Sequence, residues 1–130
     1  MINLVDAARA YLGVPFRHQG RNKLGLDCVG LVVVALADIG IVVEDEIGYS
    51  LNPHKGRLES GINRNSFLKE VPVDQIAAGD VLLIAYKHVP QHVAIKTTTG
   101  IIHSTSQLGK VVEHGFSPLF GKIVSAYRIR

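Results

Sequence analysis

Apolar residues recur at helical spacing in the first stretch of the chain. Between residues 3 and 12 they fall three to four positions apart, which predicts a short amphipathic helix; these positions are Leu4, Ala7, Ala8, Tyr11 and Leu12. Gly13 and Pro15 follow directly and end this helix. A polar, glycine-containing loop is expected from Arg17 to Gly25.

A second, almost entirely apolar run begins after Asp27 and stops before Gly40. Asp is a favourable N-cap residue, and Gly is common just past the end of a helix. The valines Val32–Val34 alone would suit a buried strand equally well. The length of the run and its two flanking signals favour a buried helix that starts at Cys28.

From Asp80 onward the pattern changes to short runs rich in β-branched residues, separated by turn residues such as Thr99-Gly100 and Gly109. Five strands are predicted, at Val81–Tyr86, His92–Thr97, Ile101–Thr105, Lys110–His114 and Ile123–Arg130. Helices followed by a run of strands predict an α+β domain, in which the N-terminal helices pack on an antiparallel sheet of about five strands.

Residues 44–72 lack a clear period and carry several Gly and Pro residues together with many polar ones. We expect a long loop here, with one helical turn near Asn63–Leu68. A long loop in so small a domain is uncommon and often functional.

Composition limits the class of protein. The chain has 130 residues, of which 47% are hydrophobic and 19% charged, and it forms a single domain over residues 1–130. One cysteine excludes an internal disulfide and a cysteine-rich zinc site. The net charge of +3, without a cluster of Lys and Arg, is too weak to indicate nucleic-acid binding.

No targeting signal is expected. Asp6 and Arg9 interrupt the N-terminal segment where a signal peptide needs an unbroken apolar run. The longest apolar stretch, Leu31–Ala37, is far shorter than the roughly 20 residues that span a bilayer. We therefore expect a protein that is made in the cytoplasm without a signal peptide and does not insert into a membrane.

Cys28 follows the predicted N-cap directly. The first turn of a helix offers unpaired N–H groups and a positive dipole end, which favour a thiolate and are expected to lower the thiol pKa. The same N–H groups stabilise a developing oxyanion. The alternative is a small buried apolar side chain, since free cysteine is among the most buried residue types.

Two histidines supply the base that such a nucleophile needs. If the strands holding His92 and His103 are joined by a turn on Thr98-Thr99, His103 faces Ala94, and the two histidines are diagonal neighbours. If the turn lies on Thr99-Gly100, His103 faces Lys96 and the histidines are too far apart. The pairing of the two imidazoles is thus a prediction of strand register.

The remaining polar residues have weaker assignments. His54 and His88 are expected to be solvated, and His114 is compatible with either a solvated or a site position. His18 lies in the loop that approaches Cys28 and is a candidate for the pocket. Asp27 is favoured as a helix cap over a catalytic acid. Arg17, with Arg21 and Lys23, is expected to lie on a solvated face, with binding of substrate carboxylates as the alternative.

Five motifs occur in an order and spacing that resemble the NlpC family of papain-like cysteine peptidases. They are Tyr11–Gly20 (YLGVPFRHQG), Leu26–Leu31 (LDCVGL), Ala78–Val81 (AGDV), His92–Ile95 (HVAI) and Ile101–Ser104 (IIHS). The Arg-His-Gln-Gly loop and the Asp-Cys-x-Gly-Leu motif look most similar to the small branch found in tailed-phage tail tips and gene-transfer agents. Together the motifs span nearly the whole chain.

The resemblance implies a papain-like thiol protease with Cys28 as nucleophile, His92 as base and His103 orienting His92. It also implies hydrolysis of amide bonds in the stem peptides of peptidoglycan, without a cofactor or metal. The expected partners are this substrate and other phage tail-tip proteins, and the expected location is the virion tail, acting at the bacterial cell wall.

Two departures from the family pattern affect which residues are expected to contact the oxyanion or the substrate. Val29 follows the cysteine where wall-recycling members have Ser, and Phe16 stands where members often have Tyr. Phe16 has no donor for an oxyanion, so His18 or a backbone N–H group takes that part. The candidates for oxyanion or substrate contacts are His18, Asp27, Arg17 and Gln19.

Three alternatives differ in class. The first is a non-catalytic tail-tip component that keeps the hydrolase fold. The second is a cysteine/histidine-dependent amidase, in which Asn, Glu or Asp rather than His103 would lie behind His92. The third is a secreted antibacterial effector with the same chemistry.

Overall fold

The computed structural model describes residues 2–45, 61–62, 65–86, 91–117 and 121–130. Two helices precede the sheet, α1 at Leu4–Arg9 and α2 at Cys28–Asp38. The side chain of Asn3 caps α1 by accepting a hydrogen bond from the N–H of Asp6, and Asp27 caps α2 in the same way through the N–H of Gly30. The left-handed backbone of Gly40, at φ 89°, follows the end of α2. Both predicted helices are confirmed.

The main sheet has six antiparallel strands in the order β3-β8-β4-β5-β6-β7. Their bounds are β3 Leu68–Val71, β4 Val81–Ala85, β5 His92–Lys96, β6 Ile101–Thr105, β7 Lys110–His114 and β8 Lys122–Ile129. The five strands predicted from the sequence are all present and differ by at most one residue at an end. The α+β architecture is therefore confirmed, with one more strand in the main sheet than expected.

The additional strand, β3, corrects the expectation of a loop across residues 44–72. Leu68–Val71 pairs antiparallel with β8 at the edge of the sheet. Only Val71 of its four residues is buried, so the segment lacks the apolar alternation that identifies a strand in a sequence. The part of the expected helical turn at residues 63 and 64, and residues 46–60 of the loop, lie outside the described residues.

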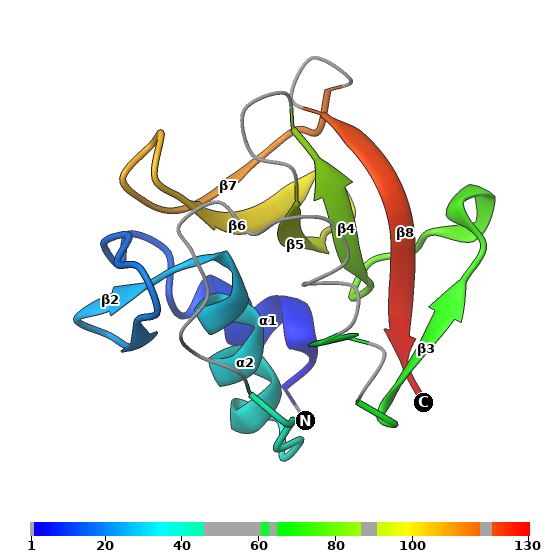
Figure 1. The fold of residues 1–130 in the computed structure, drawn as a ribbon, viewed down its shortest axis with the longest axis horizontal. Helices are drawn as coiled ribbons and strands as arrows, with labels where there is room; N and C mark the ends of the chain where they lie inside the picture. Colours follow the sequence, from blue (N-terminus) through cyan, green and yellow to red (C-terminus); the bar gives the residue numbers. More distant parts are fainter. Residues whose placement is uncertain (1, 46–60, 63–64, 87–90, 118–120) are drawn as a thin grey trace.

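The polar segment after α1 contains a two-stranded hairpin, β1 at Arg21–Asn22 and β2 at Gly25–Leu26. Its backbone runs beside the start of α2 (Figure 1). Near the middle of the sequence, a 3₁₀ turn, η1 at Val73–Gln75, leads from β3 toward β4.

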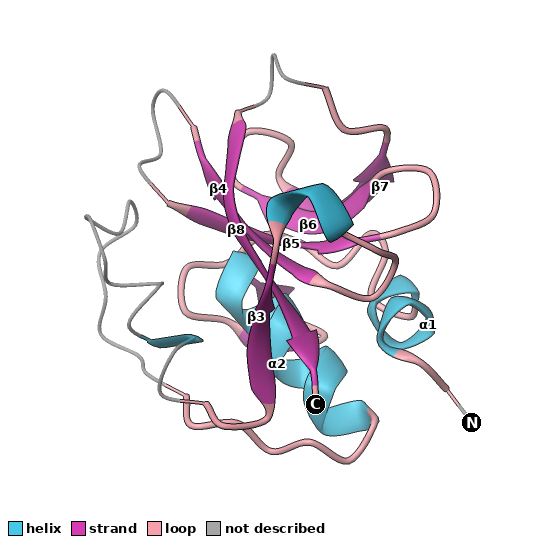
Figure 2. Cartoon of the chain, turned by 90° about the vertical axis from the view of Figure 1, so that its right-hand side faces the viewer, coloured by secondary structure: helices cyan, strands magenta, loops and turns pink. Residues whose placement is uncertain are grey.

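The sheet buries apolar residues on both faces. One face packs against α1 and α2, with Leu83, Val93 and Ile95 contributing from the strands. The opposite face holds a smaller cluster that includes Leu82 and Ile84. Figure 2 shows the two helices gathered on one side of the strands. Among the described residues, no helix is long and apolar enough to span a bilayer.

Candidate active site

Cys28 is the first residue of α2, and the buried carboxylate of Asp27 fixes its position. Asp27 is 3% exposed. One oxygen accepts the N–H of Gly30 at 2.8 Å and lies 3.1 Å from Nη1 of Arg21, and the other accepts the N–H of Gln19 at 2.8 Å. The carboxylate thus ties the Arg17–Gly20 loop and β1 to the start of the helix. The preference for Asp27 as a cap is confirmed.

Helix α2 packs against β5 and β6 of the sheet. In the described part of the chain these strands pair at Ile95–Ile102 and Lys96–Ile101, next to their connecting turn. Farther from the turn, the backbone N–H of Val93 donates a hydrogen bond toward the sulfur of Cys28. The hydroxyl of Ser104 on β6 donates to the carbonyl of Leu26 at 2.6 Å. Cys28 therefore lies close to Val93 of β5, the residue that follows His92 in the sequence.

The register of β5 and β6 brings His92 and His103 together. The turn lies on Thr98-Thr99, with the N–H of Thr97 donating to the carbonyl of Gly100 at 2.8 Å. Continued along the strands, this register places His103 opposite Ala94, as expected for the first of the two possible turns. Nε2 of His92 lies 2.7 Å from Nδ1 of His103, and both rings are buried. His103, and not Asn, Glu or Asp, contacts His92 on this side, which disfavours the amidase alternative.

A third histidine extends this pair. Nε2 of His103 lies 2.7 Å from Nε2 of His114 on β7, and Nδ1 of His114 lies 3.0 Å from the carbonyl oxygen of Gly115. From the sequence alone, His114 was compatible with either a solvated or a site position. The sequence did contain a signal for its position, because His92, His103 and His114 are each separated by eleven residues. Two successive hairpins with matching registers place residues at this spacing diagonally on one face of the sheet.

Burial keeps the inner histidines neutral. Desolvation lowers the pKa of His92 well below 6.5, and the neighbouring His103 adds to this effect. Desolvation, with a contribution from His114, lowers the pKa of His103 to about 4. At neutral pH His92 therefore has the unprotonated form that a general base requires. Within the described residues, no group of three or more His, Cys, Asp or Glu side chains is arranged to hold a metal ion.

The thiol pKa differs from the sequence-based expectation. Burial raises the pKa of Cys28 to about 12, and the charge of Asp27 adds to the rise. Hydrogen bonds from the N–H groups of Val93 and Val29, and the charge of Arg21, act in the opposite direction and are smaller. The helix start does favour the thiolate, but desolvation and the capping carboxylate outweigh it. The expectation of a lowered thiol pKa was wrong.

Tyr86, directly after β4, is a site neighbour that the sequence analysis missed. Its ring centroid lies 4.9 Å from that of His92. Burial raises the pKa of its hydroxyl to about 12, and the charge of the Cys28 thiolate contributes. The hydroxyl oxygen is buried and has no hydrogen-bond partner among the described residues. No motif distinguishes Tyr86 in the sequence, because its place depends on where β4 ends.

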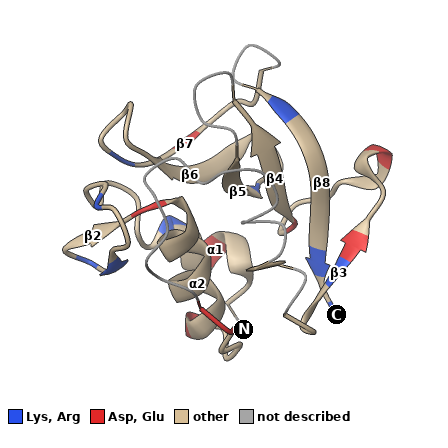
Figure 3. Ribbon diagram, in the orientation of Figure 1, with Lys and Arg blue, Asp and Glu red and all other residues tan. Residues whose placement is uncertain are grey.

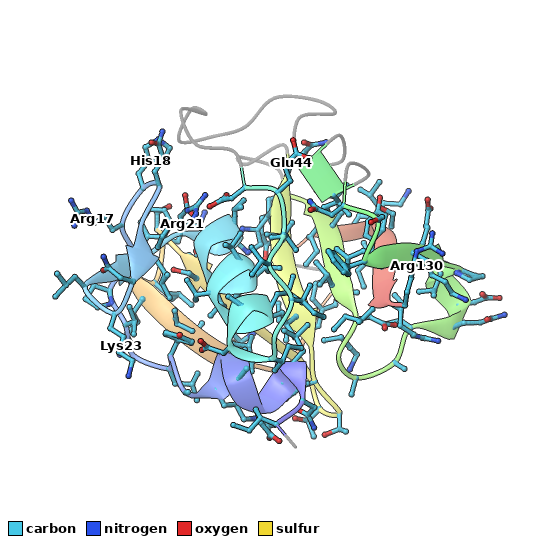
Figure 4. All side chains as sticks on the ribbon, turned by 90° about the horizontal axis from the view of Figure 1, so that it is seen from below. Arg17, His18, Arg21, Lys23, Glu44 and Arg130 are labelled. Atoms are coloured by element: carbon cyan, nitrogen blue, oxygen red, sulfur yellow. The ribbon has the colours of Figure 1, made fainter. Side chains whose placement is uncertain are left out.

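Three candidates for substrate contacts, Arg17, His18 and Gln19, lie in the loop before β1. They are not part of the cluster of His92, His103 and His114. Arg17 and His18 are exposed, and Figure 4 shows them projecting outward, with Lys23 at the opposite end of this region from His18. Figure 3 shows basic residues around the β1–β2 hairpin. Gln19 is joined to Asp27 through its backbone N–H, at a left-handed φ of 61°.

Arg21 is engaged in ion pairs. Its guanidinium contacts Asp27 at 3.1 Å and Asp45 at 2.8 Å, and its side chain is 18% exposed. It therefore differs from the solvated basic group expected for Arg17, Arg21 and Lys23. His54 and His88 lie outside the described residues.

Comparisons with known proteins agree with this architecture. The model of the NlpC/P60 family matches residues 13–126. Dipeptidyl-peptidase 6 of Lysinibacillus sphaericus is 29% identical over 93 residues, which cover 72% of this chain and 28% of that protein. The chain thus spans little more than a quarter of the length of this curated relative.

Solved structures show the same fold. The NlpC/P60 domain of the peptidoglycan hydrolase SagA has a TM-score of 0.68 at 21% identity, covering 97% of this chain and 96% of that one. The peptidoglycan hydrolase RipB of Mycobacterium tuberculosis has a TM-score of 0.65 at 22% identity, covering 98% and 64%. NlpC1 of Trichomonas vaginalis has a TM-score of 0.75 at 14% identity, covering 97% and 42%.

Proposed function

We propose that this chain, which belongs to the NlpC/P60 family, is a cysteine peptidase that hydrolyses amide bonds in the stem peptides of peptidoglycan. The curated relative is named as a peptidase, and two of the structural neighbours are named as peptidoglycan hydrolases. The observation that carries the proposal is the hydrogen-bonded pair of His92 and His103, which lies on strands that pack against the helix beginning at Cys28.

The reaction begins with a proton transfer. Nε2 of His92 is engaged by His103, so Nδ1 is the nitrogen left to accept the proton of the Cys28 thiol. The sulfur then attacks the substrate carbonyl carbon, and a tetrahedral intermediate with a negatively charged oxygen forms. The backbone N–H of Cys28, which has no partner within the helix at this first position, donates to that oxygen.

Collapse of the intermediate breaks the carbon–nitrogen bond, and protonated His92 gives its proton to the leaving amine. A thioester on Cys28 remains. His92 next takes a proton from water, whose oxygen attacks the thioester carbonyl. The acid product leaves, and the thiol regains its proton from His92. His103 holds the His92 ring in orientation throughout these steps.

The raised thiol pKa determines the order of events. With the pKa of Cys28 at about 12 and that of His92 well below 6.5, the resting pair is a neutral thiol beside a neutral imidazole. Attack therefore requires proton transfer to His92 during the reaction, because a preformed thiolate is scarce at neutral pH. Because both groups are neutral, a substrate that excludes water from the site does not change the protonation state of Cys28 or His92.

Digestion of purified peptidoglycan tests the proposal. The wild-type protein is expected to release muropeptides whose masses correspond to cleavage within the stem peptide, each product pair exposing one new amine and one new carboxylate. Cys28→Ala, which keeps the fold of α2 because Ala suits a helix, should release none. Equal release by both proteins would refute the assignment of Cys28.

The alternative of a non-catalytic component has one observation in its favour, the raised pKa of Cys28. The Cys28 thiol would react slowly with iodoacetamide at neutral pH in both cases, an inactive protein and an enzyme whose resting thiol is protonated. They differ in turnover, because only the enzyme cleaves stem peptides and loses that activity when Cys28 is alkylated at alkaline pH. No cleavage by a folded wild-type protein would favour the non-catalytic reading.

The association with a phage tail tip stays a prediction. It rests on the Arg-His-Gln-Gly loop at Arg17–Gly20 and the Asp-Cys-x-Gly-Leu motif at Asp27–Leu31. Mass spectrometry of purified tailed particles from a producing culture tests it. Detection of the chain in intact particles is the expected result, and its presence only in the particle-free supernatant, as for a secreted effector, would contradict it.

A further inference from the structure

The hydrogen bonds behind His92 end at a backbone carbonyl. From His92 they run through His103 to His114 on β7, and His114 then meets the carbonyl oxygen of Gly115. The two imidazole–imidazole distances are both 2.7 Å, and adjacent rings stand at 81° and 70° to each other. Within the described residues, each ring nitrogen of the three histidines except Nδ1 of His92 has a neighbour within hydrogen-bond distance.

A carbonyl oxygen only accepts hydrogen bonds, so with three neutral rings the contact between His114 and Gly115 assigns the proton in each hydrogen bond of the run. Nδ1 of His114 must carry a hydrogen to donate to Gly115. In a neutral His114 ring, Nε2 is then an acceptor, so Nε2 of His103 must carry the hydrogen between these two rings. Nδ1 of His103 is in turn an acceptor, and Nε2 of His92 must donate to it.

The consequence reaches the nucleophile. With its hydrogen on Nε2, neutral His92 presents a lone pair on Nδ1, the one form in which it can take the proton of Cys28. The opposite tautomer would present an N–H group to the thiol and could not act as base. Burial favours neutral forms of His92 and His103, so the direction of the hydrogen bonds decides which tautomer is present.

We propose that His114 is a positioning residue that sets the base-competent tautomer of His92, acting through His103 from the carbonyl of Gly115. This inference rests on the proposed function for its catalytic consequence, although the tautomers themselves do not depend on it. The strand register holds the arrangement in place, because His114 pairs with Ile101 and so lies on the same face of the sheet as His103.

The most direct test is the tautomeric state of the wild-type protein at neutral pH, read from ¹⁵N shifts and two-bond ¹H–¹⁵N couplings of the assigned histidines. The expected result is a hydrogen on Nε2 of His92, on Nε2 of His103 and on Nδ1 of His114. A hydrogen on Nδ1 of His92 would overturn the proposal without any substitution being made.

Variants at position 114 test the link to catalysis. His114→Phe removes the acceptor for His103, so we expect mixed tautomers at His92 and a kcat lowered about tenfold, the scale of losses when an outer hydrogen-bond partner is removed. KM should change little. His114→Gln keeps a side-chain oxygen that can accept from His103, and it should retain kcat within about threefold and the wild-type tautomers.

Glu113→Gln is the matched control. It changes the preceding residue on β7, whose side chain pairs with Arg9 of α1 instead of the histidines, and should leave the His92 tautomer and kcat unchanged. An unchanged tautomer and kcat in His114→Phe would overturn the proposal. If the wild-type protein has the stated tautomers but hydrolyses no stem peptide, the proposed function fails while the role of His114 in fixing the tautomers stands.

Discussion

At the scale of single residues, a half-buried and a buried tyrosine hydroxyl differ in their hydrogen bonding. The hydroxyl of Tyr11 on the α1 side donates to Asp38 at 2.6 Å. The hydroxyl of Tyr86, beside His92 and Cys28, has no partner among the described residues. A buried polar group without a partner costs about 1–3 kcal/mol, so the hydroxyl of Tyr86 is a local cost to folding at the site.

We therefore expect opposite outcomes for the same substitution. Tyr11→Phe should lower the free energy of unfolding by about 1 kcal/mol, the usual net value of a lost hydrogen bond. Tyr86→Phe keeps the ring against His92 and should leave this free energy unchanged or raise it. Urea denaturation of both variants and the wild type measures the difference. A loss in Tyr86→Phe as large as that in Tyr11→Phe would mean that the hydroxyl is bonded.

The sequence predicted the positions of the candidate site residues better than their ionisation. Cys28, His92 and His103 stand in the arrangement expected from a capped helix and a hairpin turn. The lowered thiol pKa was wrong because the sequence reveals the helix start but not the depth of burial. His114 and Tyr86 were not assigned, since their places depend on the register of β7 and the end of β4.

At the scale of elements, the junction between α2 and the preceding loop has no room for an added side chain at Gly30. Gly30 is in the second position after Cys28, and a Cβ there would lie 2.0 Å from the carbonyl oxygen of Gly20. That backbone oxygen cannot rotate away, so the loop or the helix would have to move. The Asp-Cys-x-Gly spacing thus allows the loop to cross closely over the start of α2.

Gly30→Ala should consequently destabilise the protein by about 1–3 kcal/mol, as overpacking does. Within a helix, the same change ordinarily stabilises by up to about 1 kcal/mol, so the sign is diagnostic. Gly115→Ala is the control, because the nearest atom to its Cβ is 3.9 Å away, and it should change stability by less than about 0.5 kcal/mol. Thermal unfolding of both variants checks this, and a stabilised Gly30→Ala protein would contradict the close crossing.

Helices and strands could be predicted where the pattern of apolar and polar residues was strong. Five of the strands follow from alternation and turn residues, whereas the sequence left the turn between β5 and β6 open between Thr98-Thr99, which the structure has, and Thr99-Gly100. The sixth strand, β3, was missed because its pairing with β8 at the sheet edge needs little apolar surface. Such a strand is stabilised by tertiary hydrogen bonds, which a local pattern does not contain.

At the scale of the whole molecule, the buried neutral histidines couple folding to pH. The pKa of His103 in the folded protein is about 4, below the value of about 6.5 in an unfolded chain. The unfolded state therefore binds more protons between these values, and stability is fully present above pH 6.5 and falls as the pH decreases toward 4. His92, whose pKa is also lowered, adds to the loss.

Removing one of these groups should flatten the pH dependence. Between pH 7 and pH 4.5 the wild type should lose about 2 to 3 kcal/mol more unfolding free energy than His103→Gln, because the variant lacks that titrating group. Urea midpoints at the two pH values measure this difference and cancel the contribution of carboxylates common to both proteins. Parallel losses in the two proteins would show that His103 is not held neutral by folding.

The account depends most on Cys28 acting as the nucleophile toward a stem-peptide amide. The direct measurement is kcat/KM for a soluble, defined stem peptide, compared between the wild type and Cys28→Ala at equal folded concentration. We expect measurable turnover in the wild type and a loss of at least about 10³-fold in the variant, the scale of losses when a nucleophile is removed. A variant that retains activity within about twofold of the wild type would contradict the account.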